Sequence, residues 1–299
     1  MITIKIRRLD QVSLVRRYPS IKAWEEFCQT LGVAKDSAAN SDLQKFKNEY
    51  ATTFAKSYLG KQWGTGVSFD FFSVQKKPAI AINVTPFKLS DDDWADFLAL
   101  LTTMFPFGPK QVWKEFKLSR LEVAVDVKLP FSELICLAPR LTIINQNYQK
   151  KGTLYLGHEF GRRSYCIYDK RKQLAETKGV HLEHDLTRIE VTLRQTGKTL
   201  GQLDEFSSPF GNLLVLRKSS LVALQKEDAL PVEVGEFISS VLSGCPAQQV
   251  YLGFDSPSRK RLMKHLRPLG LGMNPRPPEW IEWIAKQRLA LEQRFLGAG

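Results

Sequence analysis

Three short segments of the chain place acidic side chains or a tyrosine on sequence that predicts β-strands. They are residues 118–126, 163–170 and 186–194. Because side chains alternate between the two faces of a strand, Glu122 and Asp126 share one face of the first segment, and Glu190 lies on the polar face of the third. If the strands are neighbours, three carboxylates lie on one side of a sheet. Such hard oxygen ligands favour Mg²⁺ or Mn²⁺ over zinc.

The middle segment contributes a tyrosine surrounded by basic residues. A tyrosine hydroxyl ordinarily has a pKa of about 10, so Tyr168 needs help to act as a nucleophile. Lys170 and Arg171, or a bound metal ion, can stabilise its phenolate. Tyr165 lies on the opposite face of the same predicted strand, so only one of the two tyrosines faces the acids, and the pattern leaves open which. Acids for a divalent cation plus a tyrosine in a cationic setting suit phosphodiester chemistry.

The same patterns have a structural interpretation. A half-exposed strand also alternates acids with apolar residues, and Arg120, Arg188 and Arg194 can pair with acids across neighbouring strands. A single tyrosine on a strand is most often a packing residue. The strand patterns therefore leave a solvated face and a catalytic face as alternatives.

The composition favours some classes of function and excludes others. The 299 residues carry a formal net charge of +12, which favours a polyanionic partner such as nucleic acid. Four scattered cysteines without a CxxC pair argue against a zinc ribbon or a disulfide framework and fit a reducing cytoplasm. The N-terminus lacks an apolar signal segment, and no apolar stretch approaches the length of a membrane span. No P-loop and no serine or cysteine hydrolase signature is present.

The order of the helices and strands expected from the sequence predicts an α+β fold. This fold has an antiparallel sheet with flanking helices, and its N- and C-terminal regions are helical. Residues 1–60 are expected to be mostly helical, with helical spacing at 21–31 and 42–58. Ser90 and the three aspartates after it favour a capped helix start over a metal site. A sheet core spans 61–205, and a mainly helical, basic region spans 206–299. The other expected elements are a hairpin at 66–87, a strand at 118–127, a helical or irregular stretch at 131–148, a hairpin at 153–170, a helix at 170–178, a strand at 186–195, and helices at 232–243, 257–267 and 278–296.

Taken in order, these segments resemble the replication initiation factor family: the rolling-circle initiators of certain plasmids and filamentous phages, and related relaxases of conjugative elements. The family has a strand with an arginine followed by acids two and six positions later, a strand ending in Tyr-Asp-Lys, and a strand with Arg-x-Glu and a later arginine. The matching residues here are Arg120, Glu122 and Asp126; 168–170; and Arg188, Glu190 and Arg194. Glu122 departs from the family, which usually has aspartate there. The similarity covers about residues 117–195, with a weaker echo near 250–270.

The resemblance implies a nicking domain related to HUH endonucleases, in which acids replace the usual histidine pair. Asp126 and Glu190, with Glu122, would bind Mg²⁺ or Mn²⁺. Tyr168 would attack the phosphodiester at the origin, giving a 5′-phosphotyrosine and a 3′-OH that primes synthesis; Tyr165 stays an alternative. The expected setting is the cytoplasm of a bacterial host, with origin DNA and a host helicase as partners and no membrane. A non-enzymatic repressor or origin binder, and a conjugative relaxase with the same chemistry, are the alternative functions.

Such an enzyme needs a cationic groove with aromatic side chains for single-stranded DNA and a basic surface for the duplex. Tyr155 and Phe160 are candidates for stacking, and the basic helix at 259–267 is the candidate for duplex contacts. The expected DNA-contacting residues are Arg162, Arg163, Arg171, Lys172, Arg188, Arg194, Arg259, Lys260, Arg261 and Lys264.

Overall fold

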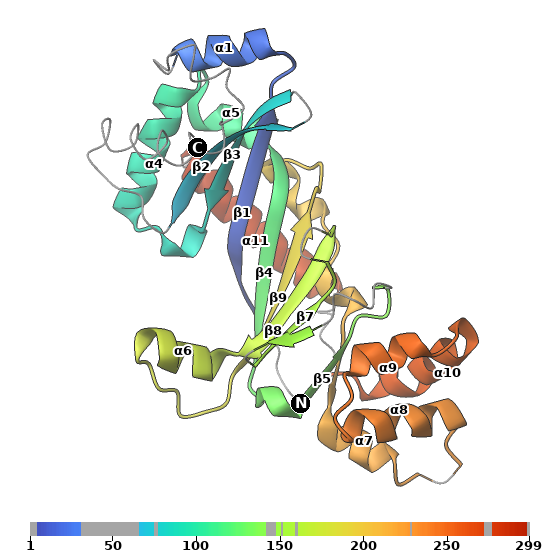
Figure 1. Ribbon diagram of the computed structural model, residues 1–299. Helices are drawn as coiled ribbons and strands as arrows, with labels where there is room; N and C mark the ends of the chain where they lie inside the picture. Colours follow the sequence, from blue (N-terminus) through green and yellow to red (C-terminus); the bar gives the residue numbers. More distant parts are fainter. Residues whose placement is uncertain are drawn as a thin grey trace. The chain divides into compact units, whose positions relative to one another are not determined.

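The computed structural model describes residues 5–30, 66–74, 77–141, 148–150, 152–158, 161–227, 229–271 and 277–297. Over these residues the chain has the predicted α+β fold with an antiparallel sheet (Figure 1). The large sheet has the strand order β2-β3-β1-β4-β9-β8-β7-β6, and a second sheet pairs β10 with β5. None of the described helices is long and apolar enough to cross a membrane.

The strands of the large sheet are β1 (Lys5–Arg17), β2 (Val67–Val74), β3 (Lys77–Val84), β4 (Lys117–Val127), β6 (Tyr148–Lys150), β7 (Thr153–Leu156), β8 (Arg163–Asp169) and β9 (Thr187–Arg194); those of the small sheet are β5 (Leu134–Leu137) and β10 (Leu214–Arg217). The helices are α1 (Ile21–Thr30), α4 (Asp91–Met104), α5 (Gly108–Glu115), α6 (Lys170–Lys178), α7 (Lys218–Leu224), α8 (Val232–Leu242), α9 (Ala247–Gly253), α10 (Ser256–Leu266) and α11 (Pro277–Leu296). Short 3₁₀ turns are η1 (Pro86–Lys88), η2 (Phe131–Glu133), η4 (Leu200–Glu205), η5 (Pro209–Asn212) and η6 (Arg267–Leu269).

The chain divides into two compact units, each assembled from separated segments. The first unit comprises residues 1–7, 123–192 and 207–280, and the second comprises residues 8–122, 193–206 and 281–299. The contiguous regions expected from the sequence, 1–60, 61–205 and 206–299, therefore do not coincide with the units. The long strands β4 and β9 each contribute residues to both, which no local composition signal reveals.

The N-terminal residues 5–17 form β1, where the sequence analysis expected helix, so the helical prediction is wrong there. Leu9, Val12 and Leu14 of β1 are buried, and β1 lies between β3 and β4 in the sheet. Buried residues occur on both faces of β1, with Leu9 and Ser13 on one and Asp10, Val12 and Leu14 on the other, so apolar residues do not alternate cleanly with polar ones. The helix predicted at 21–31 is confirmed as α1, whereas the one predicted at 42–58 lies outside the described residues.

In the second unit, a hairpin and a helix start that were predicted from local sequence are both confirmed. The hairpin predicted at 66–87 is confirmed by the antiparallel pairing of β2 with β3. Ser90 caps α4 as predicted: its hydroxyl accepts a hydrogen bond from the Asp93 amide at 3.1 Å, and the Asp93 carboxylate accepts one from the Ser90 amide at 3.1 Å. This reciprocal capping box satisfies two backbone donors at the helix start.

In the first unit, the sheet has one apolar and one polar face. The predicted hairpin at 153–170 is confirmed by the pairing of β7 with β8, in which Thr153 is opposite Tyr168 and Leu156 is opposite Tyr165. Leu156, Tyr165 and Ile167 are buried on the apolar face. The strand predicted at 186–195 is confirmed as β9, which is the neighbour of β8 in the sheet. The period-two pattern thus separates the packing residues from the polar residues of these strands.

The remainder of the first unit is a helical layer on the small β5–β10 sheet. Its core contains Leu137, Leu216, Phe237, Ile238 and Leu262. The helices predicted at 232–243 and 257–267 are confirmed as α8 and α10. The helix predicted at 278–296 is confirmed as α11, most of which belongs to the second unit. The stretch at 131–148 was predicted as helical or irregular; it begins with the 3₁₀ turn η2 but then contains the strand β5. A run of four apolar residues is too short to distinguish strand from helix.

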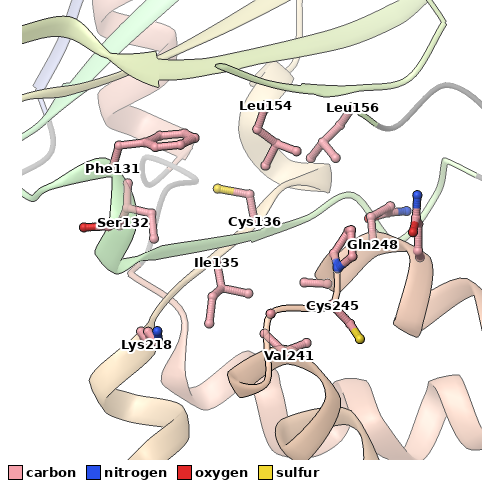
Figure 2. A pocket seen from close by; sticks show the side chains of 15 residues that line it. Phe131, Ser132, Ile135, Cys136, Leu154, Leu156, Lys218, Val241, Cys245 and Gln248 are labelled. Atoms are coloured by element: carbon pink, nitrogen blue, oxygen red, sulfur yellow. The ribbon is translucent and has the colours of Figure 1, made fainter. Parts of the chain in front are cut away.

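A pocket of about 540 Å³ lies in the first unit between β7, β5 and the end of α8 (Figure 2). Leu154 and Leu156 line one side, and Ile135, Cys136 and Val241 line the other. Most of these side chains are apolar. Burial raises the pKa of the Cys136 thiol to about 12.

This burial predicts a difference in cysteine reactivity. The thiolate is the nucleophile, and at pH 8 a thiol with a pKa near 12 is ionised in on the order of one molecule in ten thousand. We expect iodoacetamide to modify the exposed Cys245 of the native protein well before Cys136, as followed by peptide mass spectrometry. In urea both should react. Equal labelling of both cysteines in the native protein would show that the β5 strand is not packed as described.

Candidate active site on the polar face of the sheet

Strands β8 and β9 bring Tyr168 and Glu190 into direct contact. The Tyr168 hydroxyl donates a hydrogen bond to Glu190 Oε1 at 2.7 Å. Both side chains are half-buried. A carboxylate within hydrogen-bond distance of a phenol is placed to accept its proton, which is the geometry that general-base activation of a nucleophile requires.

Tyr165, the other predicted nucleophile, lies on the apolar face. It is 2% exposed, and its hydroxyl donates to the Pro209 carbonyl at 3.4 Å. Burial raises the pKa of Tyr165, and the neighbouring Arg163 only partly offsets this effect. A buried phenol with a raised pKa ionises less readily than an ordinary one. The structure thus places Tyr168, and not Tyr165, beside a carboxylate.

Lys170 lies next to the phenol ring of Tyr168. Its ammonium nitrogen is 5.7 Å from the ring centroid and donates to Gln173 Oε1 at 2.6 Å. A cation at this distance is attracted by the negative face of an aromatic ring. The predicted association of Tyr168 with a basic side chain is therefore present in the described structure.

The first turn of α6 concentrates positive charge beside Tyr168. Asp169 caps the helix by accepting a hydrogen bond from the Lys172 amide at 2.9 Å, but the turn itself consists of Lys170, Arg171 and Lys172 and contains no acid. Cations at a helix N-terminus oppose the helix dipole, at a typical cost of about 0.3–1 kcal/mol each. The helix dipole does not favour this run of charges, and protein partners offset part of it, because Arg171 pairs with Asp185 and Lys172 lies near Glu176.

Asp126 is bound to Arg188 in a buried, two-pronged ion pair. Arg188 Nε donates to Asp126 Oδ1 at 2.6 Å, and Arg188 Nη2 donates to Oδ2 at 2.8 Å. Both side chains are about 95% buried, with exposed fractions of 6% and 5%. The guanidinium therefore has little accessible surface for a phosphate, and both oxygens of the carboxylate are engaged. Of the alternatives left by the sequence, cross-strand pairing describes these two residues.

The pair makes a sharp prediction about stability. Removing one partner of a buried ion pair leaves the other charge unpaired, so Asp126→Ala or Arg188→Ala should each lower the free energy of unfolding by about 3–5 kcal/mol. The double variant Asp126→Leu/Arg188→Met should recover most of this loss, because neither charge remains. Urea unfolding of the three proteins measures the difference. As a control, Lys286→Ala, which removes the exposed pair with Glu282, should change the midpoint of urea unfolding little.

Glu122 belongs to the second unit, where Arg120 Nε donates to its Oε1 at 3.0 Å. Each of the three predicted metal-binding carboxylates therefore has a protein partner: Arg120, Arg188 or Tyr168. Among the described residues, no group of three or more His, Cys, Asp or Glu side chains is arranged to hold a metal ion. The arrangement does not fit a preformed three-carboxylate metal site, and binding of Mg²⁺ or Mn²⁺ stays a prediction.

The remaining predicted contacts near the sheet differ in their surroundings. Arg171 pairs with Asp185 at 2.9 Å, and Lys172 lies 3.8 Å from Glu176. Arg162 is exposed, whereas Arg163, Arg194 and Tyr155 are half-buried. Phe160 lies outside the described residues. The predicted contacts of the basic helix, Arg259, Lys260, Arg261 and Lys264, all lie on α10.

One interaction of this site was not foreseen, namely the direct bond between Tyr168 and Glu190. From its motif, Glu190 was expected to bind a metal ion. A signal was present, because both residues occur on polar strand faces that flank the short α6 segment, and strands joined by a short connection are often neighbours. In comparisons with known proteins, the chain matches no family model and no curated protein. The functional argument therefore rests on the motifs and on the described geometry.

Proposed function

We propose that the protein is a DNA replication initiator that nicks one strand at an origin through attack by Tyr168, on a core related to HUH/Rep-like nickases. The observation that carries this proposal is the hydrogen bond between Tyr168 and Glu190 beside the basic first turn of α6. A phenol, a base and clustered cations are the groups needed for covalent phosphodiester cleavage. The net charge of +12 supports a nucleic acid as substrate.

In the proposed reaction, the Tyr168 oxygen attacks the phosphorus while Glu190 accepts the phenolic proton. The bond between phosphorus and the 3′ oxygen breaks, and the departing oxygen takes a proton from water. The products are a 5′-phosphotyrosine on the enzyme and a free 3′-OH that can prime synthesis. Lys170 and the cations of α6 stabilise negative charge on the phosphoryl oxygens. The covalent bond conserves the energy of the phosphodiester, so strand closure needs no ATP.

Mg²⁺ or Mn²⁺ is retained as a proposed cofactor on the strength of the sequence motifs, and no step is assigned to it. When bound, such an ion would supply electrophilic stabilisation of the phosphoryl oxygens. Comparison of adduct yields with Mn²⁺, with Mg²⁺ and with EDTA tests the requirement. Yields that do not change with EDTA would remove the cofactor from the proposal.

The proposed substrate is the origin strand in single-stranded form, delivered from a duplex with the aid of a host helicase. Exposed Arg162 and the half-buried Tyr155 are the proposed contributors to a strand-binding surface, through charge and stacking. A conjugative relaxase would use the same residues and the same covalent step. It would act on a transfer origin in place of a replication origin.

The experiment that tests the proposal is incubation with a supercoiled plasmid that carries the native locus, followed by a denaturing gel. We expect relaxed plasmid with protein attached to one strand. A plasmid without the locus is the control and should remain supercoiled. Tight, salt-sensitive binding with no nicking would instead support a repressor or origin-binding protein on the same fold.

A further inference from the structure

Helix α10 and the η6 turn line a second concave surface in the first unit, of about 610 Å³, which we call the α10 groove. Its charged lining residues are Arg259, Lys260, Lys264 and Arg267, and no described acidic residue lines it. Tyr251 and Met263 form part of the floor, and both are buried. The groove shares none of its lining residues with the polar face that carries Tyr168.

Helical spacing explains how four cations face one groove. Arg259 and Met263 are four residues apart, as are Met263 and Arg267, so the three form one row along the helix. Lys260 and Lys264 form the neighbouring row. Successive members of a row rise about 6 Å along the axis. The two rows together present repeated positive charges along one side of α10.

These four cations form no close ion pair, in contrast to Arg261 beside them, although the Asp255 carboxylate interacts with Arg259 at longer range. Within the described part of the chain, no carboxylate lies at ion-pair distance from any of the four. Lys260, Lys264 and Arg267 are exposed, and Arg259 lies over the Tyr251 ring at 5.9 Å. Arg261 instead pairs with Glu233 and donates to the Ser258 hydroxyl at 3.1 Å. Positive charges that gather without a close carboxylate repel one another, and a polyanion relieves this repulsion.

We infer that the α10 groove binds the phosphate backbone of duplex DNA. Repeated cations match a repeated anion, and contacts to phosphates position a duplex without reading its sequence. None of the exposed large hydrophobic residues in the described structure lies on α10 or η6, which disfavours an anionic membrane surface. The inference deepens the proposed function, and it rests on that function only in taking DNA as the partner.

The test is fluorescence anisotropy of a labelled duplex of random sequence, titrated with the full-length protein at 50 to 200 mM salt. Each lost phosphate contact should lower the slope of log affinity against log salt by about 0.9. For Lys260→Ala/Lys264→Ala we therefore expect a slope about 1.8 smaller in magnitude. The factor by which affinity falls between 50 and 200 mM salt should then be about twelvefold smaller than in the wild type. Wild-type affinity and slope in this double variant would overturn the inference.

Arg261 was expected from the sequence to contact DNA, but it pairs with Glu233 and does not line the groove. Arg261→Ala therefore provides the matched control, because it removes one positive charge from the same helix but outside the groove. The comparison is with Lys260→Ala, one residue earlier. We expect Lys260→Ala alone to reduce the slope by about 0.9 and Arg261→Ala to leave it unchanged. Thermal melts of both proteins establish that they are folded. Equal slope reductions in the two variants would show a general charge effect and would contradict a specific groove.

Two further arms separate this inference from the nickase proposal. A single-stranded origin oligonucleotide should still form the covalent adduct with Lys260→Ala/Lys264→Ala, and Tyr168→Phe should bind the duplex with the wild-type slope. Groove-dependent duplex binding without any adduct would sustain the groove and remove the nickase. Vesicles of phosphatidylserine and phosphatidylcholine should bind no better than neutral vesicles, and lysine-dependent capture by the anionic vesicles in place of the duplex would overturn the inference.

Discussion

Replacement of Tyr168 by phenylalanine is expected to abolish the covalent adduct between protein and DNA and all strand nicking. The variant loses one oxygen, the atom that is proposed to bond to phosphorus, while its ring can keep the same place on the polar face of β8. Its fold should remain, because the hydroxyl bonds to a half-buried carboxylate and not to a deeply buried group. A denaturing gel of the reaction with plasmid measures the adduct.

Tyr165→Phe is the matched control for this experiment. It makes the same chemical change three residues earlier on the same strand, at a side chain that is buried on the other face. The lost hydroxyl makes a long hydrogen bond of 3.4 Å to the Pro209 carbonyl, so we expect a stability loss of about 1 kcal/mol at most and wild-type nicking. Nicking that survives in Tyr168→Phe but disappears in Tyr165→Phe would show that Tyr165, on the apolar face, is the nucleophile, and would contradict the proposal.

Replacement of Glu190 by glutamine is expected to lower the rate of adduct formation by about 10²–10⁴-fold, the usual contribution of a general base. Glutamine keeps the length of the side chain and can still accept a hydrogen bond from Tyr168, but it cannot take the proton. Affinity for the origin strand should stay near wild type, because the proposed strand-binding residues are Arg162 and Tyr155. Single-turnover rates with an origin oligonucleotide, measured beside binding, separate the two effects.

The dependence of the rate on pH distinguishes a base from a merely positioning residue. In the wild type, protonation of Glu190 at low pH should suppress the reaction, since the protonated carboxyl cannot accept a proton from the phenol. This fall on the acid side should be absent from Glu190→Gln. Glu190→Asp retains a carboxylate and should regain part of the rate. A glutamine variant with the wild-type rate and pH profile would exclude a role for Glu190 in proton transfer.

Local chemistry in the sequence predicted much of the fold. Ser90 followed by three aspartates is both a cap and a favourable charge for the start of α4, so the helix boundary was predictable. Period-two alternation predicted that Tyr165 and Tyr168 face opposite sides of β8, and the burial of Tyr165 confirms this. Such signals depend on residues close together in the chain, which is why a single sequence carries them.

Non-local pairing accounts for what the sequence did not predict. Strand β1 has buried residues on both faces, so its pattern lacks the alternation of a half-exposed strand. The two units interleave along the chain, and no compositional boundary marks where β4 passes from one to the other. At the candidate site, the sequence predicted which acids and arginines share the polar faces of the strands. It did not predict their partners, because the register between strands decides that Asp126 pairs with Arg188 and Glu190 with Tyr168.

The most direct test of the central claim is identification of the residue that carries the DNA. Wild-type protein is allowed to react with a single-stranded origin oligonucleotide, the adduct is digested with trypsin and nuclease, and the modified peptide is sequenced by mass spectrometry. The account predicts one nucleotide-bearing peptide, linked through the Tyr168 oxygen. A nucleotide on Tyr155, Tyr165 or any other side chain, or specific binding of the origin strand with no linked peptide at all, would contradict it.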